Sequence, residues 1–198
     1  MSTDSLLKNR NFVFFLSIRW FYSVAIQSIT LTVGWQVYIL TGNPLDLGLI
    51  GLAQVFPIFL FILPSGVIAD KFDRKIVICL CTIVHLLVAV YLLYYSLSGP
   101  TSIWPILIAL LVHGTARAMY QPSLSAILPN IVEKKVFPNA TAYNSSVGKL
   151  GHLIGPLISG VIISFYDTKV YIFAITCFAI STISILFLKN PKNPNNLK

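Results

Sequence analysis

The chain has 198 residues, of which 56% are hydrophobic and only 10% are charged, and its mean hydropathy is +0.81. This is more apolar surface than one soluble domain of this size can bury, which excludes an ordinary water-soluble globular protein. The net charge of +8 does not indicate a nucleic-acid partner, because the basic residues are dispersed in short separate segments. The composition predicts an all-α membrane protein that is surrounded by lipids.

Nearly charge-free windows of membrane-spanning length recur along the chain. A bilayer core about 30 Å thick is crossed by roughly 20 apolar residues in an α-helix. Turn residues separate the windows, for example the TGNP segment at 41–44 and the SGP segment at 98–100. Six transmembrane helices are therefore predicted, at residues 12–40, 47–69, 76–97, 103–127, 141–166 and 170–188.

Lysines and arginines concentrate in alternate loops, and cytoplasmic loops of membrane proteins are enriched in these residues. If the N-terminus is cytoplasmic, Lys169 is the one basic residue in an outer loop, and Arg19, Arg117 and Lys149 lie within spans. Both termini are then predicted to be in the cytoplasm, and the protein to be multi-pass in the cell membrane. The basic residues on the cytoplasmic side are Lys8, Arg10, Lys71, Arg74, Lys75, Lys134, Lys135, Lys189, Lys192 and Lys198.

A tight cluster of charges in the segment GVIADKFDRK, residues 66–75, separates the second and third windows. It resembles the G-x-x-x-D-(R/K)-x-G-(R/K)-(R/K) loop signature of major facilitator superfamily transporters. Asp73 stands where glycine is usual, as in the drug- and siderophore-efflux branch. The resemblance implies a conformational latch in which Asp70 pairs with Arg74; the alternative is an ordinary positive-inside loop. The matching residues are Gly66, Asp70, Lys71, Arg74 and Lys75.

The fourth window contains Arg117, which matches an arginine that faces the central cavity in similar transporters. It lies about 21 Å from the outer end of its helix, where a charge is costly, and this depth indicates a role in the substrate path. The alternative is that the side chain reaches the cytoplasmic headgroups. On the first window a polar stripe at helical spacing is expected to face the same cavity or to form interhelical hydrogen bonds. This stripe consists of Arg19, Ser23, Gln27 and Thr30.

Histidines are the other titratable groups within the spans, namely His85, His113 and His152. The simpler interpretation is that each is neutral and bonded to a neighbouring helix. All six acidic residues lie in tails, loops or helix ends, so a proton-coupled mechanism would use His113, His152 or a group outside this chain. We place His113 with the candidates for the substrate path. Cys79, Cys81 and Cys177 are expected to be inert, and no metal or cofactor is predicted.

The fifth window contains two glycines four residues apart, a further glycine and a proline, in the segment KLGHLIGPLISG. Such glycines let a neighbouring backbone approach closely, and the proline softens the helix. The segment resembles the G-x-x-x-G-P-x-x-x-G signature of exporting members of the superfamily, although helix packing alone could explain it. The residues concerned are Gly151, Gly155, Pro156 and Gly160.

The resemblance covers nearly the whole chain and implies half of a major facilitator fold, made of two inverted three-helix repeats. The expected parts are a cytoplasmic tail at 1–11, the first repeat at 12–97, the second at 98–188, and a tail or truncated inter-half linker at 189–198. The sequence contains neither the H-E-x-x-H zinc motif nor the G-x-S-x-G nucleophile turn, so neither motif indicates an enzyme.

The implied function is secondary transport, as export of a small amphipathic molecule such as a drug or siderophore by alternating access. Its partners would be membrane lipids, the small-molecule substrate, and a second six-helix half or a second copy of the chain. Two alternatives stay open. One is a half-size transporter that works as a homodimer or with a separate half, and the other is a nonfunctional fragment of a split gene.

Overall fold

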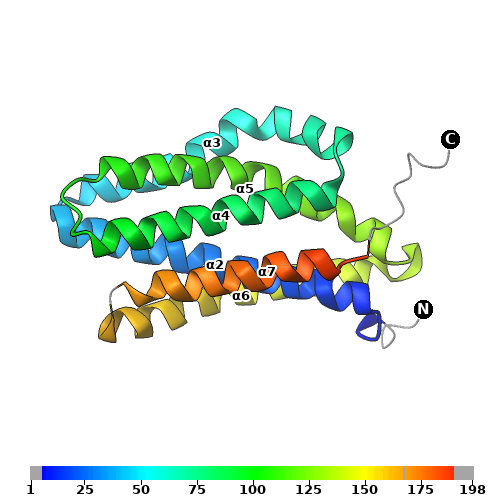
Figure 1. Ribbon diagram of the computed structural model, residues 1–198. Helices are drawn as coiled ribbons and strands as arrows, with labels where there is room; N and C mark the ends of the chain where they lie inside the picture. Colours follow the sequence, from blue (N-terminus) through cyan, green and yellow to red (C-terminus); the bar gives the residue numbers. More distant parts are fainter. Residues whose placement is uncertain (1–5, 167, 190–198) are drawn as a thin grey trace.

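The computed structural model describes residues 6–166 and 168–189, apart from the side chains of 62, 63 and 65–71. The described residues form six long α-helices and the short 3₁₀ helix η1 (Lys134–Val136) (Figure 1). The long helices are α2 (Arg10–Thr41), α3 (Pro44–Lys71), α4 (Arg74–Leu97), α5 (Trp104–Ile131), α6 (Phe137–Phe165) and α7 (Lys169–Phe187). Each predicted span coincides with one of them.

The largest differences from the predicted spans are at the ends of α5 and α6. Helix α5 continues to Ile131, beyond the window that ends at 127, and α6 begins at Phe137, before the window that begins at 141. A hydropathy window marks only the apolar part of a helix, whereas the hydrogen-bonded ladder continues through polar residues at its ends.

Within the described residues, α2, α3, α4, α6 and α7 are long and apolar enough to cross a membrane. Helix α5 is equally long but carries His113, Arg117 and Gln121 in its central part, which lowers its hydropathy. With α5 as the sixth helix, the architecture is the predicted all-α membrane fold.

The helices pair in a pattern with two-fold character. Helix α2 packs along α6 and α7, α5 packs along α3 and α4, and α4 packs against α7. Exchanging α2 with α5, α3 with α6 and α4 with α7 reproduces these pairings, and α2 and α5 run in opposite directions. The prediction of two inverted three-helix repeats is thus confirmed. Figure 1 shows α3 and α6 on opposite sides of the bundle.

Local chemistry explains where the helices begin and end. The Asn9 side chain accepts hydrogen bonds from the amides of Asn11 and Phe12 and so caps α2. Gly42 ends this helix at φ 63°, in the left-handed region where glycine carries no Cβ penalty. The Asp73 carboxylate caps α4 by accepting from the Lys75 amide at 2.9 Å. Asp73 has φ −62°, so the turn between α3 and α4 does not need the usual glycine.

Hydrogen bonds tie the helix ends together at the end of the bundle where α2 begins. Arg74 Nη1 donates to the Ala126 carbonyl near the end of α5 at 2.7 Å. Lys75 Nζ donates to the carbonyls of Leu186 and Leu188, at 3.0 and 2.7 Å, and so satisfies acceptors that the end of α7 leaves open. The Lys189 amide donates to Asn11 Oδ1 at 3.3 Å. Helix α2 therefore begins where α7 ends.

Candidate functional site: a polar seam between α2, α5 and α6

The seam begins at Arg19, which α2 directs toward both α5 and α6. Its Nη1 donates to Gln121 Oε1 on α5 at 2.8 Å. On the other side, a Cβ at Gly148 of α6 would lie 2.6 Å from Arg19 Nε, so the guanidinium rests in space that only glycine leaves open. The Nε atom is buried without a hydrogen-bond partner in the described structure. The residues of this polar seam are Arg19, Arg117, Gln121, Gly148, Lys149 and His152.

The same face of α6 continues the close contact with α2. A Cβ at Gly151 would lie 2.7 Å from Ser23 Cβ, and one at Gly155 would lie 2.8 Å from the Val24 carbonyl oxygen. A Cβ at Gly160, in contrast, would meet no described atom within 4 Å. Gly151 and Gly155 thus belong to the packed face, and Gly160 points away from it. The buried Ser159 continues that face.

Arg117 stands near the middle of α5 and is partly buried. It stands one helical turn after His113 and one turn before Gln121, which accepts the hydrogen bond from Arg19. Arg19, Lys149 and His152 line one cavity of about 410 Å³. Positive charge from three helices therefore converges on one region of the bundle.

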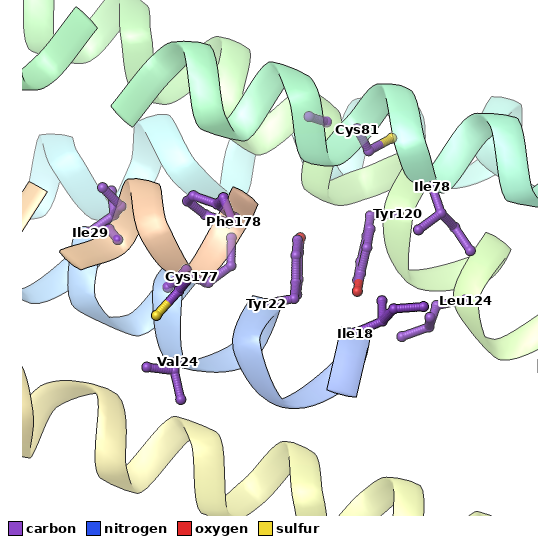
Figure 2. Close-up of a cluster of buried hydrophobic side chains, with 14 of the residues drawn as sticks. Ile18, Tyr22, Val24, Ile29, Ile78, Cys81, Tyr120, Leu124, Cys177 and Phe178 are labelled. Atoms are coloured by element: carbon purple, nitrogen blue, oxygen red, sulfur yellow. The ribbon is translucent and has the colours of Figure 1, made fainter. Parts of the chain in front are cut away.

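A second polar group, the buried relay, links Tyr22 of α2, His85 of α4 and His113 of α5. Tyr22 OH and His85 Nε2 are 3.1 Å apart, and His85 Nδ1 and His113 Nδ1 are 3.0 Å apart. Tyr22 also stacks on Tyr120, as Figure 2 shows, with ring centroids 3.5 Å apart. His113 is fully buried, so it bonds to α4 and does not line an open path in this arrangement.

The predicted stripe on α2 packs against neighbouring helices. Ser23 is buried beside Gly151, and Gln27 lies against Gly155. Thr30 donates to Gln54 Oε1 of α3 at 3.0 Å, which is the interhelical bonding offered as the alternative for this stripe. Arg19 is the member of the stripe that reaches the cavity of about 410 Å³.

The loop motif is described in part. The side chains of Gly66, Asp70 and Lys71 lie outside the described residues, so the pairing of Asp70 with Arg74 stays a prediction. Asp73 caps α4, and the side chains of Arg74 and Lys75 donate to backbone carbonyls at the ends of α5 and α7. These bonds join elements within this one chain.

Sequence reasoning missed Gln121 and Gly148. Gln121 stands one helical turn after Arg117, and Gly148 stands three residues before Gly151, so both lie at spacings that place them on the faces already considered. Neither residue differs enough in polarity from its sequence neighbours to be chosen as a site residue until the helix packing is known. Among the described residues, no group of three or more His, Cys, Asp or Glu side chains could hold a metal ion.

The family described as transmembrane secretion effector matches residues 10–198, which is almost the whole chain. The chain belongs to the major facilitator superfamily of transporters. This major facilitator chain is 30% identical over 156 residues to the staphyloferrin A transporter of Staphylococcus aureus (strain NCTC 8325 / PS 47). It is also 20% identical over 153 residues to macrolide efflux protein A of Streptococcus pyogenes.

These alignments cover 77% of this chain in both cases, but only 39% of the staphyloferrin A transporter and 38% of the macrolide efflux protein. A third relative, multidrug resistance protein 1 of Bacillus subtilis (strain 168), is 30% identical over 141 residues, which are 67% of this chain and 33% of that protein. The major facilitator chain therefore spans between a third and two fifths of these relatives.

Proposed function

We propose that this chain forms one six-helix wall of an exporter that moves a small amphipathic molecule across the cell membrane by alternating access. The relatives' names refer to efflux of macrolides, to multidrug resistance and to transport of staphyloferrin A, and they support this substrate class. A second six-helix unit, either another chain or another copy, would supply the opposite wall. Both ends of the chain would lie in the cytoplasm.

The single observation that carries this proposal is the position of Arg117. A charged side chain in the middle of a membrane helix is unfavourable by roughly 2.5–3.5 kcal/mol on insertion scales, and such residues usually face a bundle interior or a water-filled path. Arg117 stands one helical turn before Gln121 of the seam, which accepts a hydrogen bond from Arg19 of α2. Bundle stability alone does not require a charge there, whereas a substrate or a coupled ion gives it a function.

The test is export in an efflux-deficient bacterium. The chain would be expressed alone and together with the C-terminal half of the staphyloferrin A transporter, and accumulation of radiolabelled erythromycin and of staphyloferrin A would be measured. We expect lower intracellular accumulation of at least one compound than with the empty vector. Arg117→Ala should abolish this difference while membrane abundance on immunoblots stays normal.

Lys169→Ala is the matched control, because Lys169 lies at the start of α7 with its ammonium over the Tyr166 ring, away from the seam. It should leave export unchanged. Accumulation equal to the empty vector under both pairings would reject the proposal. Export that persists in Arg117→Ala would reject the role of the arginine. Crosslinking in membranes would show whether a chain that exports alone does so as two copies.

A further inference from the structure

The seam has positive charge and no acidic counterpart on its own helices. Arg19 comes from α2, Arg117 from α5 and Lys149 from α6. Helices α2, α5 and α6 contain no aspartate or glutamate. The acidic residues whose side chains the structure describes, Asp46, Asp73 and Glu133, stand at helix ends. Arg19 and Arg117 are partly buried and Lys149 is exposed, and their own helices supply no acidic side chain to neutralise them.

Arg19 is held by weak partners for a guanidinium. One of its terminal nitrogens donates to the neutral Gln121 amide, and its Nε is enclosed beside Gly148 without an acceptor. A guanidinium has five N–H donors in a planar fork that matches two oxygens of a carboxylate. An oxyanion therefore satisfies this side chain better than the protein groups around it do.

The position of the seam excludes headgroups that stay at the membrane surface. Arg117 is near the middle of α5, which puts it about 20 Å from either end of that helix. The cavity of about 410 Å³ beside Arg19, Lys149 and His152 provides space for a small group next to the guanidinium. Its lining also includes Leu153, so an apolar body could lie beside the charged group.

We infer that the seam binds a carboxylate of the transported molecule, with Arg19 and Arg117 as its ligands. This inference rests on the proposed function and adds the charge of the substrate to it. In the empty state, the hydrogen bond to Gln121 holds Arg19 beside Gly148. When substrate binds, Arg19 leaves this position and contacts the carboxylate. Lys149 adds positive potential at the cavity mouth.

The test measures binding without transport. The purified chain in phosphatidylcholine nanodiscs would be titrated with radiolabelled citrate at constant ionic strength, with its neutral trimethyl ester as the uncharged comparison. We expect saturable citrate binding, no binding of the ester, and about tenfold or greater weakening in Arg19→Gln and in Arg117→Gln. Arg19→Lys should retain part of the affinity, because the charge remains while the fork is lost.

Lys169→Gln removes the same charge outside the seam and should bind citrate as the parent does. Size-exclusion profiles and helical circular dichroism show whether each variant is folded, and Arg19→Lys and Arg117→Lys replace any that is not. No saturable binding by the parent, equal binding of the ester, or equal loss in Lys169→Gln would overturn the inference. Competitive displacement of citrate by phosphatidylglycerol in the nanodiscs would also overturn it, in favour of a lipid headgroup.

The two proposals fail separately. Citrate binding that depends on Arg19 without any export in cells would reject the exporter and leave the carboxylate site. Export that is unaffected by Arg19→Gln, together with absent citrate binding, would reject the carboxylate site and leave the exporter.

Discussion

The hydrogen bonds of the buried relay restrict which of its nitrogen and oxygen atoms can carry a proton. A neutral imidazole has one N–H donor and one acceptor nitrogen. If His85 Nδ1 donates to His113 Nδ1, His85 Nε2 accepts from the Tyr22 hydroxyl; in the reverse order, His85 donates to Tyr22. Two cationic rings would place N–H against N–H across 3.0 Å. The two histidines therefore cannot both be charged while this contact persists.

Replacing the central ring of the relay tests its contribution to stability. His85→Phe keeps a ring that can stack beside Phe178 but leaves the Tyr22 hydroxyl and His113 Nδ1 without their partner. We expect a loss of about 1–3 kcal/mol, because buried polar groups become unsatisfied. Thermal unfolding in detergent would show it as a lower midpoint.

Tyr22→Phe combined with His85→Phe is the matched control, since it removes one of the groups left unpaired. The double variant should be less destabilised than the sum of the two single variants. A midpoint for His85→Phe equal to that of the parent would show that the relay does not stabilise the bundle.

Sequence reasoning at the residue scale identified chemistry but not partners. Arg19 and Arg117 are conspicuous because charges are rare in apolar windows, and the structure joins Arg19 to Gln121, one helical turn after Arg117. That His113 bonds to His85 could not be predicted, because the contact depends on how α4 and α5 rotate about their axes. Periodicity places a residue on a face but does not say which helix covers that face.

The close contact between α2 and α6 depends on missing side chains. Small residues let membrane helices approach until backbone atoms touch, and association then relies on van der Waals packing. Along α6, Gly148, Gly151 and Gly155 meet α2, whereas Gly160 faces open space. The glycine pattern predicted such a face, and Gly151 and Gly155, four residues apart, share it. Gly160 stands five residues after Gly155, about 140° further round the helix, and so lies on another face.

Adding a methyl group should have opposite effects at two of these glycines. In Gly155→Ala the new Cβ would lie 2.8 Å from the Val24 carbonyl oxygen, which belongs to backbone and cannot move aside. We expect a loss of about 1–3 kcal/mol from overpacking. Gly160→Ala meets nothing and should gain up to about 1 kcal/mol from helix propensity.

Thermal unfolding of both variants in the same detergent measures this difference. If Gly155→Ala and Gly160→Ala melted at the same temperature, α6 would not pack against the Val24 carbonyl of α2 as closely as the structure shows. The pair is matched, because both residues lie on α6 and the substitution is identical.

At the scale of the whole molecule, the ends of α2 and α7 lie together. The Lys189 amide reaches Asn11 Oδ1 at 3.3 Å, and Figure 1 shows α2 beginning where α7 ends. The number of spans and their short loops made this predictable from sequence, because six antiparallel crossings return the chain to its starting side. The helix pairing was not predictable from loop length, since α2 packs mainly on α6 and α7 and less on α3.

Cysteine labelling in intact cells tests the orientation. In a background with Cys79, Cys81 and Cys177 replaced by serine, cysteines at positions 43 and 99 should react with a membrane-impermeant maleimide. Cysteines at positions 9 and 189 should react only after permeabilisation, because basic residues favour the cytoplasmic side. Labelling of 9 and 189 on opposite sides would contradict the fold, and labelling of both in intact cells would reverse the orientation.

The interlocked pairing of the helices has a consequence for biosynthesis. Helices α2, α3 and α4 leave the ribosome first, yet they make few contacts with one another, and their main neighbours are α5, α6 and α7. Until those later segments enter the bilayer, the nascent chain holds Arg19 in lipid without Gln121 or the groove at Gly148. The helices therefore pack together only after the later segments have been inserted. An insertase that retains α2, α3 and α4 until then would favour folding more than their rapid release into the membrane.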